Sequence, residues 1–448
     1  MRNFFLLITL LPFYAIADFI TAIDDYDNQK YESAYHQFVE MAKLGETRSQ
    51  FNLGVMFFNG EFVKKDINKA YAWLKVATSS NIATDQEKQV FERITKKVTN
   101  QKQADEAFSQ IINFSNEALI TNLYPELLEQ GKNPDYLAIP TKVVTPKYPR
   151  KAVRKRTQGW VKLRLDVDKK GYPRNVLLLE SEPENLFDKE SLNAIIQWRF
   201  KPTLNEKNEP IATKNLLYTM QFLLGGTKKA LINKLSFKKA IEGHNQNNPN
   251  STYQLALWSK NKLLHSEAFN TNELFLKSAI RGHTQAQFEV GQSLIFGKGC
   301  KVNKLKGLAW LNRAASNGEL DAKELLANVL MSNNDIGSQQ QAIEYYKSIK
   351  DTNSLTKINY AKLLINSSHK EISNPEKALN IIENIPYNLF RDRITLDEVK
   401  ASAYFKLGKL RKAISFQEDA LSHANHYAAD TTDAEETLRK YKAEESST

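Results

Sequence analysis

The sequence predicts an α+β protein in which a small domain of short helices and strands lies between α-helical solenoid segments. Two segments, Ser49–Asn81 and Ala286–Gly318, align with each other without a gap and have helical periodicity. Nine of the thirteen prolines lie between Pro125 and Pro210, where long helices are therefore disfavoured. Within that region, apolar and polar residues alternate strictly from Val161 to Asp168, which is the pattern of a half-buried strand.

The first seventeen residues are predicted to be a secretory signal peptide, cleaved before Asp18. Arg2 is followed by an apolar run that starts at Phe4 and ends in Ala15-Ile16-Ala17, a small-x-small pattern. This run is shorter than the ~20 residues needed to span a bilayer, although an uncleaved membrane anchor is the alternative. No later stretch is apolar enough to span a bilayer, so the mature chain is expected to be exported without a transmembrane segment. Export makes nucleic acid an unfavourable partner.

Each copy of the repeat is predicted to be a helical hairpin. Gly54 and Gly291 would let its two helices approach closely, and Gly60 and Gly297 suit a positive φ where the first helix ends. Such a hairpin cannot bury its apolar face alone, so it must stack on neighbours. The apolar face of the second helix in the first copy consists of Ala70, Trp73, Leu74 and Ala77.

These residues resemble the Sel1-like repeat, a relative of the tetratricopeptide repeat. The first copy departs from the family pattern at Phe62, where glycine is preferred. The second has Cys300 at the usual valine and Asn303 at the usual aspartate. Cys300 is the only cysteine, so it cannot form an internal disulfide, and we interpret it as a small buried apolar residue.

The central segment is predicted to fold in the order helix, strand, strand, helix, strand. A short helix starts after Pro149, and two strands flank a turn at Gly171. The stretch from Phe187 to Phe200 has the periodicity of a helix, which Pro202 would stop. The apolar stretch from Leu216 to Phe222 is the last strand.

The same segment resembles the TonB C-terminal domain family over about 85 residues. The matching residues are Tyr148-Pro149, Ala152, Gly159, Val161 to Asp166, Gly171, Val176, Ser181, Phe187-Asp188, Trp198 to Pro202, Pro210 and Phe222. The resemblance implies a periplasmic domain of two helices on a three-stranded antiparallel sheet. It also implies contact with outer-membrane receptors through a short extended receptor segment, and in some relatives with peptidoglycan. The chain departs from an energy transducer of this family because it has neither a long proline-rich spacer nor a long N-terminal anchor.

The predicted organisation assigns a role to each part of the chain. It comprises a signal peptide (1–17), Sel1/tetratricopeptide-like repeats (18–130), a linker (131–140), a TonB C-terminal-like domain (141–224), Sel1-like repeats (236–331) and tetratricopeptide-like repeats (335–430). Flexible joints are expected near 131–140 and 225–235.

Two surfaces of the central domain are candidates for partner binding. Its net charge is +8 between Pro140 and Leu224, out of +11 for the whole chain, which favours an anionic partner there. The candidate basic patch consists of Arg150, Lys151, Arg154, Lys155 and Arg156. The last strand carries no charge and no proline to block strand addition, although a neighbouring repeat or a second copy could cover it. The residues of this candidate edge are Leu216, Leu217, Tyr218, Thr219, Met220, Gln221 and Phe222.

No pattern indicates catalytic, cofactor-binding or metal-binding residues. Trp73, Trp310 and Trp198 are interpreted as core residues, and Asp166 and Asp168 as surface acids linked to Lys162 and Arg164. His423 and His426 lie one helical turn apart without a third ligand nearby. The sequence therefore predicts a non-catalytic periplasmic scaffold that binds envelope proteins or peptidoglycan. The alternatives are an energy-transducing or accessory component of TonB-dependent transport and an enzyme acting on the cell wall.

Overall fold

The structure is a computed structural model that describes residues 18–80, 83–128, 139–157, 159–183, 185–204, 208–222, 248–260, 270–349, 354–383, 385, 390–426 and 431–447. The chain divides into two compact units. The first comprises residues 1–130, 241–295 and 300–319, and the second comprises residues 131–240, 296–299 and 320–448. The predicted signal peptide, the joint near 225–235 and most of the predicted linker lie outside the described residues.

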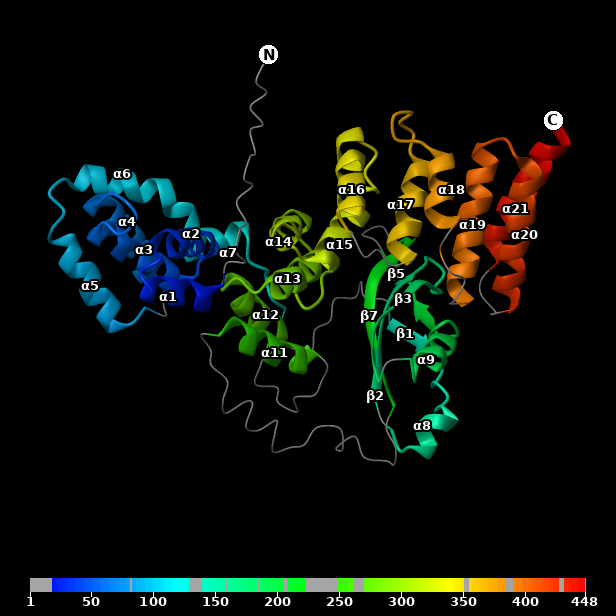
Figure 1. The fold of residues 1–448 in the computed structure, drawn as a ribbon, viewed down its shortest axis with the longest axis horizontal. Coiled ribbons are helices and arrows are strands. Elements are labelled where there is room, and N and C mark those ends of the chain that lie inside the picture. The colour runs from blue at the N-terminus through cyan, green and yellow to red at the C-terminus, as the bar shows by residue number, and fades with distance from the viewer. Residues whose placement is uncertain are drawn as a thin grey trace, which may run out of the picture. The chain divides into compact units, whose positions relative to one another are not determined.

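The first unit consists of helices on both sides of the central domain in sequence (Figure 1). They are α1 (Phe19–Asp27), α2 (Tyr31–Ala42), α3 (Thr47–Asn59), α4 (Ile67–Thr78), α5 (Asp85–Thr95), α6 (Gln101–Ile111), the short 3₁₀ helix η1 (Ile112–Phe114), α7 (Asn116–Asn122), α11 (Pro249–Lys260), α12 (Thr271–Ile280), α13 (Thr284–Phe296) and α14 (Lys304–Ser316).

The glycines act in the repeats as the sequence predicts. A Cβ at Gly54 would lie 2.6 Å from Leu74 Cγ of the partner helix, so only glycine permits this approach. Gly60 ends α3 with φ of 83°, and Gly297 has φ of 64° after α13, a backbone region that glycine adopts without strain. Both predictions for these glycines are confirmed.

Helices from before and after the central domain form one unit. The Phe19 amide donates to the Arg281 carbonyl at 3.2 Å, and Leu127 pairs with Cys300 as an isolated antiparallel bridge. The Trp310 indole N–H donates to the Leu123 carbonyl at 3.0 Å. The central domain therefore interrupts, in sequence, a helical unit whose two parts are joined by backbone hydrogen bonds.

The second unit combines the sheet domain with the C-terminal helices. The sheet domain contains β1 (Ile139–Lys142), α8 (Arg150–Arg154), β2 (Gly159–Val167), β3 (Pro173–Glu182), α9 (Asp188–Ile195), β4 (Arg199–Lys201), β5 (Thr203–Leu204), β6 (Pro210–Ile211) and β7 (Thr213–Phe222). The helices are α15 (Leu320–Leu330), α16 (Ile336–Ser348), α17 (Ser354–Asn366), α18 (Pro375–Glu383), α19 (Phe390–Lys406), α20 (Leu410–His426) and α21 (Thr432–Ser447).

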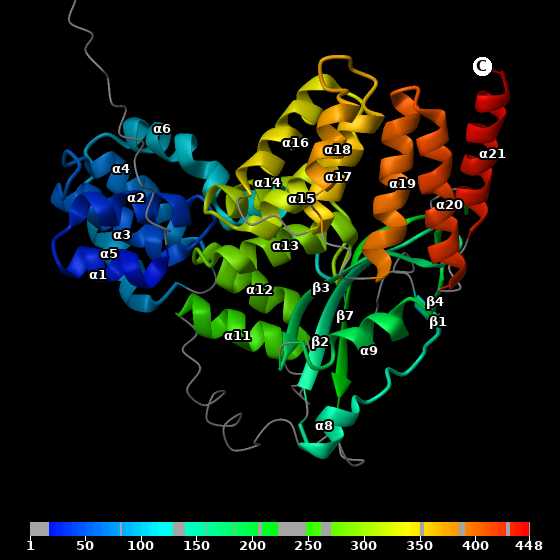
Figure 2. The same ribbon diagram turned by 45° about the vertical axis from the view of Figure 1, so that its right-hand side comes forward.

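The main sheet is antiparallel in the order β3-β2-β7, so β2 is central and β7 is an edge strand (Figure 2). The alternation predicted for β2 is confirmed, because four apolar side chains of one face are fully buried: Val161, Leu163, Leu165 and Val167. The side chains of Ala152 in α8 and Ile195 in α9 belong to the same core. The predicted architecture of two helices on a three-stranded antiparallel sheet is present.

One local prediction is wrong. The helix expected from Phe187 to Phe200 ends at Ile195, and Arg199–Lys201 forms β4. The Phe200 amide donates to the Gly171 carbonyl at 2.9 Å, so this segment is tied to the β2–β3 turn. The strand β1, which starts at the end of the segment predicted as a linker, pairs with β4.

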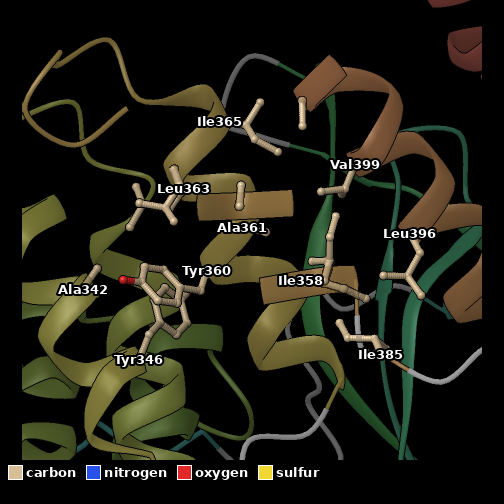
Figure 3. Packing of buried hydrophobic residues seen from close by; sticks show 14 of the residues in the cluster. Ala342, Tyr346, Ile358, Tyr360, Ala361, Leu363, Ile365, Ile385, Leu396 and Val399 are labelled. Atoms are coloured by element: carbon tan, nitrogen blue, oxygen red, sulfur yellow. The ribbon is translucent and has the colours of Figure 1, made fainter. Parts of the chain in front are cut away.

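The C-terminal helices share a core that fixes the orientation of α19. Figure 3 shows Leu396 and Val399 of α19 close to Ile358 of α17, and all three are buried in one cluster. Since one face of α19 is occupied in this way, other side chains of the helix are turned toward the sheet domain.

Candidate functional site

The candidate edge strand lies at the border of the sheet. Residues of β7 pair with β2 from Gly159 opposite Phe222 to Val167 opposite Thr213. No other strand in the described part of the chain pairs with β7. Leu216, Met220 and Phe222 are buried in the core, whereas Thr219 and Gln221 are exposed. The side chain of Leu217 lies outside the described residues.

Two aromatic residues of the TonB-like pattern hold this strand in place. The Tyr148 hydroxyl donates to the Thr157 carbonyl at 2.7 Å and to the Phe222 carbonyl at 3.4 Å. The Trp198 indole N–H donates to the Val144 carbonyl at 2.9 Å, and its ring packs edge-on against Tyr218. Trp198 is 9% exposed, so its assignment to the core is confirmed. Burial raises the pKa of Tyr218 to about 12.

The basic patch is a short, exposed surface beside the sheet. Its five side chains are all exposed, and no hydrogen bond or ion pair joins them to another described residue: Arg150, Lys151, Arg154, Lys155 and Arg156. Only Ala152 anchors α8 in the core. The patch is therefore available to an anionic partner, at the cost of mutual repulsion between like charges.

The second face of the sheet differs from the prediction. Arg164 does not lie on a solvent face, because its Nη2 is 2.7 Å from Oε1 of Glu324 in α15, and both side chains are 4% exposed. The ion pairs expected between these strand residues are also wrong, because neither Asp166 nor Asp168 pairs with Lys162 or Arg164. Asp168 pairs with Arg174 at 3.0 Å, and Asp166 accepts a hydrogen bond from Asn175 at 2.7 Å. Sequence alternation could not show that a residue of α15 pairs with Arg164.

A groove of about 1120 Å³ lies between the sheet domain and the C-terminal helices. The β2–β3 turn and α9 line one part of it, and α17, α19, α20 and α21 line the rest. Sequence reasoning missed this site. The polar stripe Thr395, Glu398, Ser402 on α19 is a visible signal, but the sequence does not say which element faces it.

The remaining sequence candidates have structural roles. Trp73 and Trp310 are 8% and 0% exposed, which confirms their assignment to the core. Cys300 is fully buried, as predicted, and burial raises the pKa of its thiol to about 12, so it is a poor nucleophile at neutral pH. His423 Nδ1 lies 3.2 Å from Asp397 Oδ2. Among the described residues, no group of three side chains is arranged to hold a metal ion, and no helix is long and apolar enough to cross a membrane.

Comparisons with known proteins cover parts of the chain. Residues 144–222 match the family described as Gram-negative bacterial TonB protein C-terminal, and residues 47–81 and 284–319 match the Sel1 repeat. The chain is 35% identical over 82 residues to protein TonB of Yersinia enterocolitica, which covers 18% of this chain and 29% of that protein. It is 40% identical over 57 residues to protein TonB of Escherichia coli strain K12, which covers 13% and 24%. The chain thus spans less than a third of the length of these relatives.

Among solved structures, a Sel1 repeat protein from Oxalobacter formigenes is similar with 16% identity and a TM-score of 0.33, and the match covers 43% of this chain and 80% of that chain. The two family resemblances stated from the sequence are confirmed by the matches above. The chain contains a TonB C-terminal domain at residues 144–222 and Sel1 repeats at residues 47–81 and 284–319.

Proposed function

We propose that this protein is a non-catalytic periplasmic scaffold of the Gram-negative envelope whose TonB C-terminal domain captures an extended partner segment by strand addition to β7. The position of β7 at the edge of the sheet carries this proposal. An edge strand offers unpaired backbone donors and acceptors, and its sequence has neither a charge nor a proline between Leu216 and Phe222. The helical repeats would hold further partners.

A pair of proline variants tests strand addition. Backbone amides alternate in direction along a strand, so Tyr218 and Gln221, three residues apart, point theirs to opposite sides of β7. One proline therefore removes an outward donor, and the other removes a bond to β2. We expect one folded variant with about tenfold weaker partner capture, the effect of one lost hydrogen bond, and one destabilised variant.

Capture is measured by photo-crosslinking from Thr219 in the full-length protein in native envelopes, followed by mass spectrometry. Val143, which is 58% exposed and lies outside the sheet edge, is the matched control position for the crosslinker. A folded outward-facing proline variant that still crosslinks to the same envelope protein at full yield would exclude β7 as the binding edge.

The basic patch supports a second candidate partner, the anionic polymer peptidoglycan. Its five exposed side chains have no described partner, so a polyanion would relieve their repulsion. Replacing all five by glutamine should abolish most co-sedimentation with isolated sacculi, and 1 M salt should do the same, because the Debye length falls to about 3 Å. Sedimentation that resists both changes would assign cell-wall binding to another surface.

A role in TonB-dependent transport is the alternative proposal. The similarity to TonB proteins supports it, although it is confined to the C-terminal domain. A scaffold should crosslink to its partner equally well before and after a protonophore collapses the proton gradient. A crosslink pattern that changes with the gradient would instead favour an energy-transducing role.

A further inference from the structure

The groove beside α19 is built from side chains that converge from separate elements of the second unit. Helical stripes at spacings of three to four residues line it on α9 and α21, for example Lys189 and Asn193, and Thr437 and Tyr441. The β2–β3 turn contributes Tyr172. Neither the edge of β7 nor the basic patch contributes to this lining, so the groove is a separate surface.

The dimensions of the groove favour a chain segment over a small molecule. Its volume of about 1120 Å³ is larger than that of a typical small-molecule pocket, which is roughly 300–1,000 Å³. Along α19 the lining runs from Ile394 to Lys406, which corresponds to roughly 18 Å at 1.5 Å per residue. An extended peptide covers that distance with about six residues at roughly 3.3 Å each.

Glu398 gives the groove a defined anchor. Its side chain is partly buried and lines the groove, and no hydrogen bond or ion pair joins it to another described residue. Burial raises the pKa of Glu398, while Lys362 of α17 and Arg174 of β3 favour its charged form, and Asp433 of α21 and Asp397 oppose it. Neither cation closes an ion pair with it, and Arg174 is 3.0 Å from Asp168. A partly buried carboxylate without an ion-pair partner is stabilised by a ligand cation.

The rest of the lining suits a peptide. Leu192 of α9 and Phe405 of α19 offer partly buried apolar surface for side chains. Asn193 of α9 and Asn366 of α17 offer carboxamides, which donate and accept hydrogen bonds as a peptide group does. A lining that combines apolar surface with hydrogen-bonding groups can fix the orientation of a ligand.

We propose that this groove binds an extended segment of about six residues from a partner protein, and that Glu398 takes the positive charge of a lysine or arginine side chain in that segment. This second site is independent of strand addition at β7. A scaffold with both sites would hold two protein segments at once on its second unit.

The test uses the purified full-length chain and a library of N-acetylated, C-amidated hexapeptides, so that no terminal charge contributes. We expect the bound peptides to be enriched in lysine or arginine at one position. Replacing that residue by norleucine in the best binder should weaken binding to the wild type at least tenfold, measured by fluorescence anisotropy. The same replacement should change binding to Glu398→Gln less than twofold, because the charge partner is gone.

Control variants separate the groove from other surfaces. Glu376→Gln removes an exposed acid of α18 outside the groove and should retain the full preference for the basic residue. The folded Tyr218 or Gln221 proline variant should also retain it, which distinguishes this site from the edge of β7. Thr437→Arg places a cation in the groove from α21 and should abolish binding of the basic hexapeptide, so the test does not depend on Glu398→Gln alone.

Several outcomes would overturn the proposal. The first is a library that shows no preference for lysine or arginine, or a preference that Glu398→Gln retains. Another is Glu398-dependent binding of soluble peptidoglycan fragments in the absence of any hexapeptide binding, which would make the groove a cell-wall site. Release of reducing sugars from sacculi by the wild type but not by Glu398→Gln would instead show that Glu398 is a catalytic acid of a cell-wall hydrolase.

Discussion

The two Sel1 copies fold alike where backbones approach and differ where side chains meet their neighbours. A Cβ at Gly54 would lie 2.6 Å from Leu74 Cγ, and one at Gly291 would lie 2.8 Å from Leu311 Cγ. The Gln50 side chain donates to the Ala42 carbonyl at 3.0 Å, and its equivalent Gln287 donates to the Ala279 carbonyl at 3.2 Å. Identical residues at a constant offset thus have identical roles within the hairpin.

The equivalent residues that differ show which features each copy requires. Asp66 and Asn303 differ in charge but both accept backbone hydrogen bonds as N-caps, so the usual aspartate is needed for its oxygen alone. Trp73 stacks on Phe114, whereas Trp310 donates a hydrogen bond to the Leu123 carbonyl. The hairpin therefore fixes the position of each tryptophan, and the neighbouring segment determines its contacts.

The largest expected difference between the copies is in their response to acid. Glu46 and His283 occupy equivalent positions, and each accepts a hydrogen bond from the next helix, Glu46 from the Ser49 amide at 2.6 Å and His283 from the Ala286 amide at 3.2 Å. Burial lowers the pKa of His283 from 6.5 to about 4. The contribution of neutral His283 to the free energy of unfolding is fully present above pH 6.5. It is lost as the pH falls toward 4, because the unfolded chain takes up the proton at a higher pH than the folded chain.

Burial raises the pKa of Glu46. The contribution of Glu46 to the free energy of unfolding is therefore lost as the pH rises through its pKa in the folded state, which is the opposite direction to His283. We expect the buried His283 to lower the free energy of unfolding by about 2–3 kcal/mol between pH 7 and pH 4, after allowance for its partial exposure. His283→Asn keeps a capping oxygen and should remove this loss, as measured by urea unfolding at each pH. If the free energy of unfolding falls with pH as steeply in His283→Asn as in the wild type, His283 is not the source of the acid sensitivity.

Much of the fold could be predicted from local pattern. The alternation of β2 predicted its four core residues because one face of the sheet packs on α8 and α9. The glycines predicted the hairpins because a side chain at Gly54 or Gly291 would clash with the facing helix, and because Gly60 and Gly297 adopt a positive φ that costs most other residues strain. The extent of α9 could not be predicted. Trp198 lies three residues after Ile195 and Phe200 lies four after Ile196, which are helical spacings, but the two aromatic residues belong to the loop and β4.

The candidate site could be predicted only in part. The basic residues of α8 are exposed, as expected for a short charged segment, and β7 is at an edge, as the family resemblance implied. The buried pair of Arg164 and Glu324 joins residues 160 positions apart, and the groove needs α19 and α9 together. Such long-range neighbours are set by packing between repeats and sheet, for which periodicity contains no signal.

The glycines at the helix crossings provide the next test of the comparison. Gly54→Ala and Gly291→Ala should each lower the free energy of unfolding by about 1–3 kcal/mol, because the new methyl group meets a fully buried leucine that cannot move away. The two costs should agree within about 0.5 kcal/mol if the copies use this residue alike, as measured by urea unfolding of the two variants. Gly337→Ala is the control, since its Cβ would meet no atom closer than 3.5 Å. If the alanine substitution destabilises one copy but not the other, the two helices pack differently in the two copies.

The smallest expected effect is at Phe62 and its equivalent Gly299. Both have positive φ, 60° for Phe62 and 68° for Gly299, a conformation that costs a bulky residue roughly 1 kcal/mol. Phe62 recovers this through rings of Tyr35 and His36 at centroid distances of 5.4 and 5.7 Å, since aromatic pairs contribute about 0.5–1.5 kcal/mol. Phe62→Gly should therefore change the unfolding free energy by less than about 0.5 kcal/mol.

Gly299→Phe should cost about 1 kcal/mol, because the residues equivalent to Tyr35 and His36 are Asn272 and Glu273, which carry no ring. Removing the ring at position 35 sharpens the test. In a Tyr35→Ala background the compensation at Phe62 is weakened, so Phe62→Gly should become stabilising by a few tenths of a kcal/mol. If Phe62→Gly instead destabilises the wild type by more than about 1 kcal/mol, the aromatic contacts outweigh the backbone strain, and the departure from glycine in the first copy stabilises the fold.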